Sequence, residues 1–147
     1  MNKFETTAAN YYMNGFNCAQ AVLVAYKEEL SIPEKELLKI SCGFGAGMGR
    51  LQNTCGAVSG AYMVIGLKFG KDSKEDNDAR EKTYGLVREF DLEFKRKHIS
   101  SNCKELLNCD LLSEDGQKYF KENNLSETIC RKCVVDSVSI LNKLLKK

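Results

Sequence analysis

The chain of 147 residues has the length of one ordinary domain and is long enough to bury a hydrophobic core. Its net charge of +2 gives no electrostatic reason to expect a nucleic acid or an anionic membrane surface as partner. A single proline, with abundant Ala, Leu, Lys and Glu, favours an all-α fold. We expect one domain over residues 1–147, a helical bundle of about six to eight helices.

The first part of the chain is predicted to hold three helices that lead into a glycine-rich loop. Residues 4–13 form the first, and Asn17 can cap a second over residues 18–30. Apolar side chains cover most of the circumference of this second helix, which is typical of a buried helix. A third helix runs over residues 33–41, and the loop at residues 42–49 has glycine at every second position.

The centre of the chain places a cysteine at the predicted start of a fourth helix, residues 55–69. Asn53 or Thr54 can cap this helix. Gly56 and Gly60 are four residues apart, so they give the helix a flat face on which a neighbouring backbone can pack closely. The sequence therefore predicts that another helix lies near Cys55.

The second half of the chain predicts four more helices and no strands. They cover about residues 79–97, a short stretch from residue 103, residues 111–124, and the segment from about residue 128 onward. Apolar residues exposed on the long helices would allow a homodimer. The chain has no apolar run of membrane-spanning length, so membrane insertion is not expected.

Seven cysteines are the most informative feature of the composition. The N-terminal residues lack the apolar core of a signal peptide, so we expect a cytoplasmic protein. Structural disulfides are rare in the cytoplasm, where clustered cysteines more often serve metal or redox chemistry.

Four of these cysteines share a position near a helix start. Cys18, Cys55 and Cys103 each come one residue after an Asn or Thr that can cap a helix, and Cys130 falls near the first turn of the last helix. A helix N-terminus favours the thiolate form, so four converging ends would suit a thiolate cluster or a metal–thiolate centre. The alternative is that each cysteine is simply a small buried hydrophobic residue.

The remaining cysteines and the one histidine give weaker signals. Cys130-x-x-Cys133 has thioredoxin-like spacing but no preceding strand, so Cys133 is either a resolving thiol or part of the core. A zinc site would need a second such pair or two histidines, and His98 is expected to cap a helix C-terminus instead. Cys42 and Cys109 are expected to serve packing.

The glycines are the candidate cofactor-binding positions, because they let a backbone approach a cofactor or the cysteine site closely. They are Gly43, Gly45, Gly47, Gly49, Gly56 and Gly60. No strand precedes the loop and no P-loop lysine follows it, so a nucleotide site is not supported.

At these residues the sequence resembles the C_GCAxxG_C_C family of small bacterial redox-active proteins. The Cys-Gly-Ala-x-x-Gly motif of the family stands here at residues 55–60, its leading cysteine element matches residues 15–22, and its glycine loop matches residues 43–49. The third and fourth family cysteines match Cys103 and Cys130. The resemblance covers nearly the whole chain.

This resemblance implies a redox-active cysteine protein, either an oxidoreductase or an electron-transfer protein, without defining its reaction or its redox partner. It implies that Cys18, Cys55, Cys103 and Cys130 are catalytic. The same four, with Cys133 as a further candidate, would be the ligands if the cofactor is an iron–sulfur cluster or another thiolate-bound metal.

Two other hypotheses use the same residues. In one, the thiols cycle between dithiol and disulfide without a cofactor. In the other, the chain is a non-enzymatic module that binds a metal or a small ligand. A purely structural helical protein with buried thiols is the third alternative.

Overall fold

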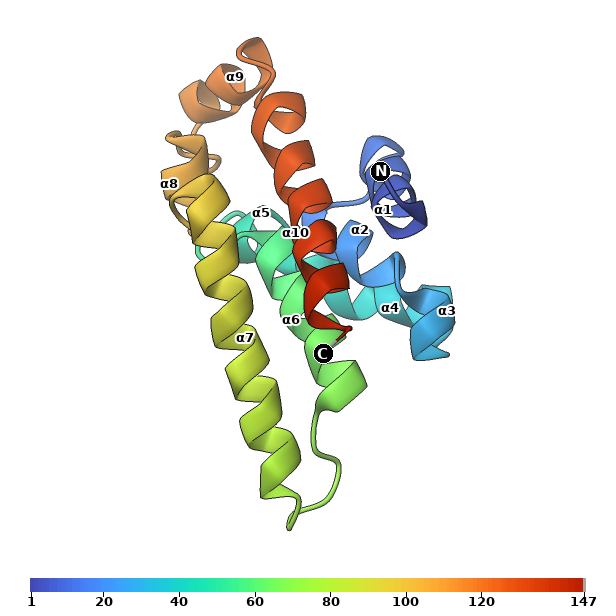
Figure 1. Cartoon of the computed structure of the whole chain (residues 1–147). Coiled ribbons are helices and arrows are strands. Elements are labelled where there is room, and N and C mark those ends of the chain that lie inside the picture. The colour runs from blue at the N-terminus through green and yellow to red at the C-terminus, as the bar shows by residue number, and fades with distance from the viewer. Residues whose placement is uncertain (147) are drawn as a thin grey trace.

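The structure, a computed structural model, describes residues 1–146, and these residues fold into helices joined by short loops (Figure 1). The helices are α1 (Lys3–Met13), α2 (Cys18–Val24), α3 (Lys27–Leu30), α4 (Glu34–Ser41), α5 (Gly45–Met48), α6 (Gly56–Phe69), α7 (Asn77–His98), α8 (Cys103–Leu107), α9 (Glu114–Glu122) and α10 (Arg131–Leu144). A 3-10 turn occupies Cys42–Phe44, and a π-helical turn, Ser126–Cys130, leads directly into α10. Over residues 1–146 the only extended pairing is one bridge between Thr54 and Asn102, so the all-α prediction is confirmed.

One helix predicted as continuous is interrupted. The segment 18–30 divides into α2 and α3, and Tyr26 between them has φ −103° and ψ 14°. Tyr26 is buried, its ring stacks on Phe4, and its hydroxyl lies 2.7 Å from Asn142 Oδ1. These contacts anchor the break to both ends of the chain.

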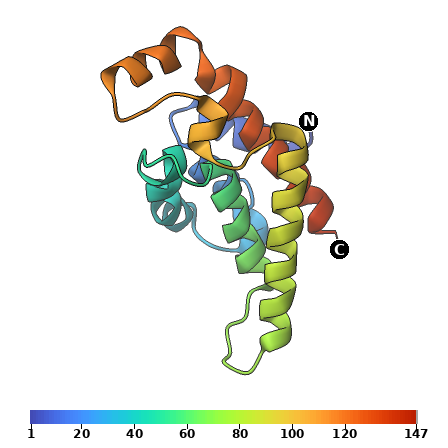
Figure 2. The same ribbon diagram turned by 90° about the vertical axis from the view of Figure 1, so that its left-hand side faces the viewer.

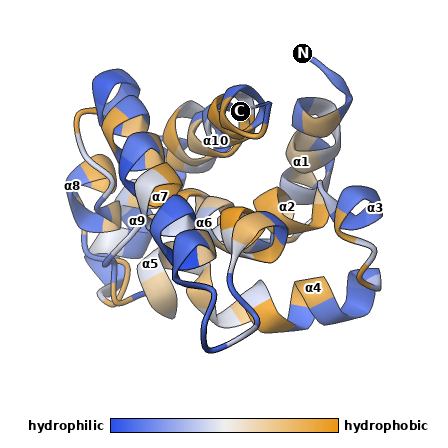
Figure 3. Cartoon of the chain, turned by 60° about the horizontal axis from the view of Figure 1, so that its bottom comes forward, coloured by the Kyte–Doolittle hydropathy of each residue, from blue (hydrophilic) through white to orange (hydrophobic). Residues whose placement is uncertain are grey.

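The core is built around α6, which packs against α2, α7 and α10, and α10 also packs against α2 (Figure 1). Ala57, Val58, Ala61, Val64 and Ile65 of α6 are all buried. In Figure 3 α2 and α6 are largely hydrophobic, whereas α7 carries long hydrophilic stretches on its outer side. A helix that is apolar on all sides belongs inside the bundle, which is where α6 lies.

The glycines of α6 allow α2 to approach closely. A Cβ added to Gly60 would lie 2.8 Å from the carbonyl oxygen of Ala19, and one added to Gly56 would lie 3.1 Å from the Ala19 nitrogen. This confirms the flat face predicted from their spacing. Because these two helices touch near their N-terminal ends, Cys18 and Cys55 enter the same region.

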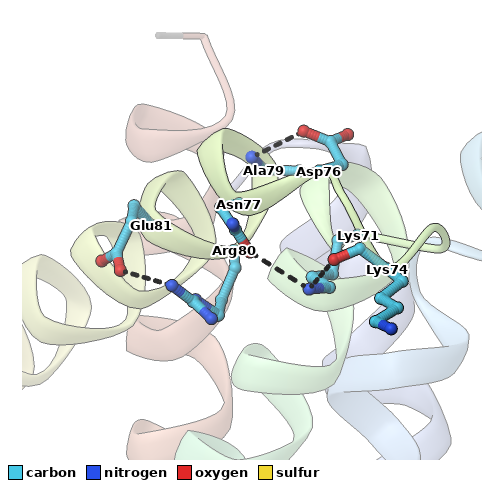
Figure 4. A network of polar contacts seen from close by, with 7 residues as sticks. All are labelled: Lys71, Lys74, Asp76, Asn77, Ala79, Arg80 and Glu81. Carbon is cyan, nitrogen blue, oxygen red and sulfur yellow. Dashed lines mark hydrogen bonds and ion pairs between the residues drawn. The ribbon is translucent and has the colours of Figure 1, made fainter.

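The loop between α6 and α7 lies at the opposite end of the molecule from α8 and α9 (Figure 2). Asp76 caps α7 by accepting a hydrogen bond from the Ala79 amide at 3.1 Å (Figure 4). The Lys71 ammonium donates to the carbonyl of Lys74 at 2.9 Å and lies 3.4 Å from the side-chain oxygen of Asn77. These exposed contacts fix the turn and are remote from the cysteines. None of the helices in residues 1–146 is both long and apolar enough to cross a membrane.

Candidate functional site

A cavity of about 310 Å³, called here the thiol cavity, lies where the N-terminal ends of α2, α6 and α8 meet the start of α10. Five cysteines from these elements line it: Cys18, Cys55, Cys103, Cys130 and Cys133. The four cysteines that the sequence singled out are therefore brought together, and Cys133 joins them. Cys42 is exposed and Cys109 half-buried, and neither lines the cavity.

Cys18 is positioned by a capping box at the start of α2. The Asn17 side chain accepts a hydrogen bond from the Gln20 amide at 3.0 Å, and the Gln20 side chain accepts one from the Asn17 amide at 3.0 Å. The side-chain Nδ2 of Asn17 also donates a hydrogen bond to the backbone carbonyl of Cys42 at 2.9 Å. The predicted cap is thus present, and it ties α2 to the 3-10 turn at the start of the glycine loop.

Cys55 and Cys103 are held side by side by backbone pairing. The Cys55 amide donates to the carbonyl of Ser101 at 2.8 Å, and the Cys103 amide donates to the carbonyl of Asn53 at 2.7 Å. Because Thr54 is engaged in this bridge, Cys55 itself is the N-cap of α6, and the prediction that Asn53 or Thr54 caps this helix is wrong.

The start of α8 lies at the position predicted from the sequence. The side chain of Asn102 accepts a hydrogen bond from the Glu105 amide at 3.1 Å, so Cys103 follows its cap as predicted.

Gln52 anchors the loop between α8 and α9. Its side chain is buried, donates to the carbonyl of Cys109 at 2.8 Å and accepts from the Leu111 amide at 2.8 Å. Gly47 packs directly over this point with φ +66°, and a Cβ there would lie 2.5 Å from Gln52 Cα and 2.7 Å from Cys103 Cβ. Only glycine fits such a left-handed, crowded position.

The six candidate glycines have different surroundings. Gly47 and Gly56 line the thiol cavity. Gly45 packs against the Asn17 side chain and Gly60 against α2, whereas a Cβ at Gly43 or Gly49 would meet open space.

Four of the five cavity thiols shift one another's pKa in two pairs. A hydrogen bond with the Cys133 thiol lowers the pKa of Cys55, and the backbone N–H groups of Ala57 and Val58 at the start of α6 act in the same direction. The same thiol–thiol bond, together with burial, raises the pKa of Cys133. The pKa of one thiol of this pair is therefore lowered, and that of the other is raised.

The second pair repeats this asymmetry. A hydrogen bond with Cys18 lowers the pKa of Cys130, and this bond and burial raise the pKa of Cys18. The Tyr12 hydroxyl lies within hydrogen-bonding range of Cys130 and is 2.7 Å from the hydroxyl of Ser126.

Cys103 stands apart from both pairs. Burial raises its pKa to about 12, so it is protonated at neutral pH. It packs with Leu107, Leu111 and Leu125 in a small apolar cluster at the cavity wall.

The contacts around Cys133 could not be predicted from the sequence. His98 Nδ1 lies 4.0 Å from Cys133 Sγ, and His98 Nε2 lies 2.8 Å from Asp136 Oδ2. The His98 ring also stacks on Phe94 with centroids 4.6 Å apart. His98 therefore links Cys133 to a carboxylate, rather than serving the expected helix cap.

Within the described part of the chain, no three His, Cys, Asp or Glu side chains are placed so as to hold a single metal ion. The chemistry that the site offers is that of closely spaced thiols in an apolar cavity. The fold and the site together define an all-α protein with a buried cluster of cysteines.

Comparison with known protein families identifies the family to which the chain belongs. A family model described as "Putative redox-active protein (C_GCAxxG_C_C)" matches residues 16–144. The chain therefore belongs to the C_GCAxxG_C_C family, as its motifs indicated. Searches of curated proteins and of solved structures give no match to the chain.

Proposed function

We propose that this chain is a redox protein that carries out reversible thiol–disulfide exchange in the thiol cavity. The observation that supports this function is that five cysteines line one cavity, where Cys55 and Cys133, and likewise Cys130 and Cys18, shift each other's pKa in opposite directions. In each pair a thiol with a lowered pKa faces one with a raised pKa. This division favours an ordered exchange, because the thiol with the lowered pKa supplies the thiolate that attacks first and its neighbour attacks in the second step.

The exchange uses an oxidised partner that contains a disulfide. The Cys55 thiolate attacks one partner sulfur, a mixed disulfide forms, and the first partner thiolate leaves. Cys133 then loses its proton and attacks Cys55 Sγ, which releases the second partner thiolate and leaves a Cys55–Cys133 disulfide. The protein has lost two electrons and two protons, and the partner has gained them. The reverse sequence reduces the protein.

His98 is placed to accept the proton of Cys133. With Nε2–H donating to Asp136, the lone pair of Nδ1 is directed toward the sulfur at 4.0 Å. The second pair has a different neighbour, because the Tyr12 hydroxyl can donate a hydrogen bond to a Cys130 thiolate. The two pairs are thus suited to different steps or different partners.

A second candidate function is electron transfer by an iron–sulfur cluster held by Cys18, Cys55, Cys103 and Cys130. The observation that favours it is that Cys103 faces the same cavity without joining either pair. Four cysteines supply the full donor set of such a cluster without another residue type. A bound cluster would supply one-electron transfer.

The two functions are distinguished by purification without oxygen. An absorption spectrum, with iron and labile-sulfide analysis, is recorded before and after an attempt to reconstitute a cluster. Free thiols are then counted, and oxidised peptides mapped, before and after reduction.

Disulfides at Cys55–Cys133 and Cys18–Cys130 in iron-free protein would support thiol–disulfide exchange. Visible bands with iron and sulfide, lost in Cys103→Ser and retained in Cys133→Ser, would support the cluster. Cys42→Ser is the control for a thiol outside the cavity and is expected to change neither result. Protein without iron that forms neither disulfide would contradict both functions.

A further inference from the structure

The lining of the thiol cavity carries no charge other than that of an ionised cysteine. Among residues 1–146, its lining contains no Asp, Glu, Lys, Arg or His, although 29% of the chain is charged. Glu127 and Arg131, which adjoin the lining residues Ser126 and Cys130 in the chain, form an ion pair with each other at 3.4 Å. A ligand with a carboxylate therefore meets no cation on the cavity wall, and a ligand with an ammonium group meets no anion there except the attacking thiolate.

The polar side chains of the lining are already engaged. Tyr12 and Ser126 hydrogen-bond to each other, with 2.7 Å between their hydroxyl oxygens. The Asn17 side chain is used in the cap of α2 and in its bond to Cys42. A carboxylate that entered the cavity would leave its water shell without gaining a charged partner, and an ammonium group would gain only the attacking thiolate, so burial of either group is unfavourable.

The rest of the wall is apolar. It is formed largely by Phe16, Leu106, Leu107, Leu111, Phe120 and Ile129. A cavity of about 310 Å³ is at the small end of the range for small-molecule sites, roughly 300–1,000 Å³. Its size and its lining both select a small molecule with apolar substituents.

We propose that the exchange partner of the thiol cavity is a small, uncharged organic disulfide, and that disulfides carrying carboxylate or ammonium groups are excluded. This inference rests on the proposed thiol–disulfide exchange. Each turnover converts the protein dithiol and one uncharged disulfide into the protein disulfide and two molecules of free thiol. Electrons, protons and sulfur atoms therefore balance without another reactant.

The test compares three disulfides of similar size. Bis(2-hydroxyethyl) disulfide is uncharged, cystamine carries two ammonium groups, and 3,3′-dithiodipropionate carries two carboxylates. Each is added to the reduced wild-type protein, samples are quenched with an alkylating agent, and peptide mass spectrometry follows the oxidation of Cys55 and Cys42. Exposed Cys42 reports the intrinsic reactivity of each reagent in the same sample.

The expected result is that the uncharged reagent oxidises Cys55, relative to Cys42, at least about tenfold faster than either charged reagent. Tenfold corresponds to about 1.4 kcal/mol, which is less than the usual cost of burying an unpaired charge. Equal relative rates, or a preference for a charged reagent, would overturn the proposed substrate class while leaving exchange intact. If Cys42 reacts and Cys55 reacts with no reagent, the proposed function itself fails, and the substrate class with it.

A matched pair of variants locates the selectivity in the cavity wall. Leu106 lines the cavity and is half-buried, so Leu106→Lys places an ammonium group at the wall, whereas Leu112→Lys changes an exposed residue that does not line it. Leu106→Lys should speed oxidation by dithiodipropionate and slow oxidation by cystamine, and Leu112→Lys should do neither. The same response in both variants would overturn the proposal. Should Leu106→Lys fail to fold, the three-reagent comparison on the wild-type protein decides alone.

Discussion

Replacing Gln52 with methionine should destabilise the fold by about 2–4 kcal/mol. Methionine has nearly the same length and shape, so the change removes the amide without opening a large cavity. Gln52 is 3% exposed, and its amide bonds the Cys109 carbonyl and the Leu111 amide, both at 2.8 Å. The substitution therefore leaves two backbone groups without their partner.

The magnitude follows from the surroundings of those two groups. An unsatisfied buried donor or acceptor costs about 1–3 kcal/mol. The Leu111 amide bond is buried, so the full cost applies to it, whereas the Cys109 carbonyl is only partly buried and water can replace part of its bond. The sum is about 2–4 kcal/mol.

Urea unfolding followed by circular dichroism measures this difference. With a slope of about 2 kcal/mol per molar, the midpoint should fall by about 1–2 M. Leu51→Met is the matched control, because Leu51 is 65% exposed and its replacement should change stability by less than about 0.5 kcal/mol. A Gln52→Met midpoint that coincides with that of the control would refute the reasoning from buried amide bonds.

Three further predictions follow from the site and the fold. Cys133→Ala should raise the pKa of Cys55, because it removes the largest influence that lowers it, and pH-dependent alkylation of the Cys55 peptide measures the change; an unaltered profile would count against the pair. Gly60→Ala should cost about 1–3 kcal/mol, because its Cβ would lie 2.8 Å from a backbone oxygen of α2. A Cβ at Gly66 would meet nothing within 4 Å, so Gly66→Ala should instead stabilise the fold by about 0.5–1 kcal/mol. Urea midpoints of the two variants that shift in the same direction would contradict the packing argument. The folded pKa of Cys103 is about 12 against an ordinary 9.0, so the unfolded thiol ionises first and stability should fall as pH rises from 9 toward 12. After allowance for screening by water in the cavity, the free energy of unfolding should fall by up to about 1 kcal/mol per pH unit. The fall should be smaller in Cys103→Ala, and the same pH dependence in the variant and the wild type would exclude this thiol as its source.

Local signals in the sequence predicted the parts of the structure that depend on local contacts. The caps at Asn17 and Asn102 act within three residues of their partners, so their residue types were sufficient. The spacing of Gly56 and Gly60 likewise predicted close packing of a neighbouring helix. These local features predicted that Cys18, Cys55 and Cys103 lie near helix starts, without any information on contacts between helices.

Contacts between distant segments could not be predicted in this way. Tyr12 and Ser126 are 114 residues apart, and no periodicity links them. The pairing of Cys133 with Cys55 and His98 depends on the angle at which α10 crosses α6 and α7, which one sequence does not define. The Thr54–Asn102 bridge similarly displaced the expected cap, because backbone pairing between distant loops overrides a local preference.

The separation of the thiol partners along the chain sets the order in which the site can be made. Cys18 and Cys130 are 112 residues apart (130 − 18), and Cys55 and Cys133 are 78 apart (133 − 55). A ribosome delivers Cys130 and Cys133 last, so until α10 has emerged and docked Cys18 and Cys55 can meet only each other and the earlier thiols Cys42, Cys103 and Cys109. An oxidant present during synthesis would therefore favour crosslinks among these earlier thiols that the finished fold does not use. Correct pairing must wait for the last helix, which makes the reduced state of the newly made chain a condition for building the site.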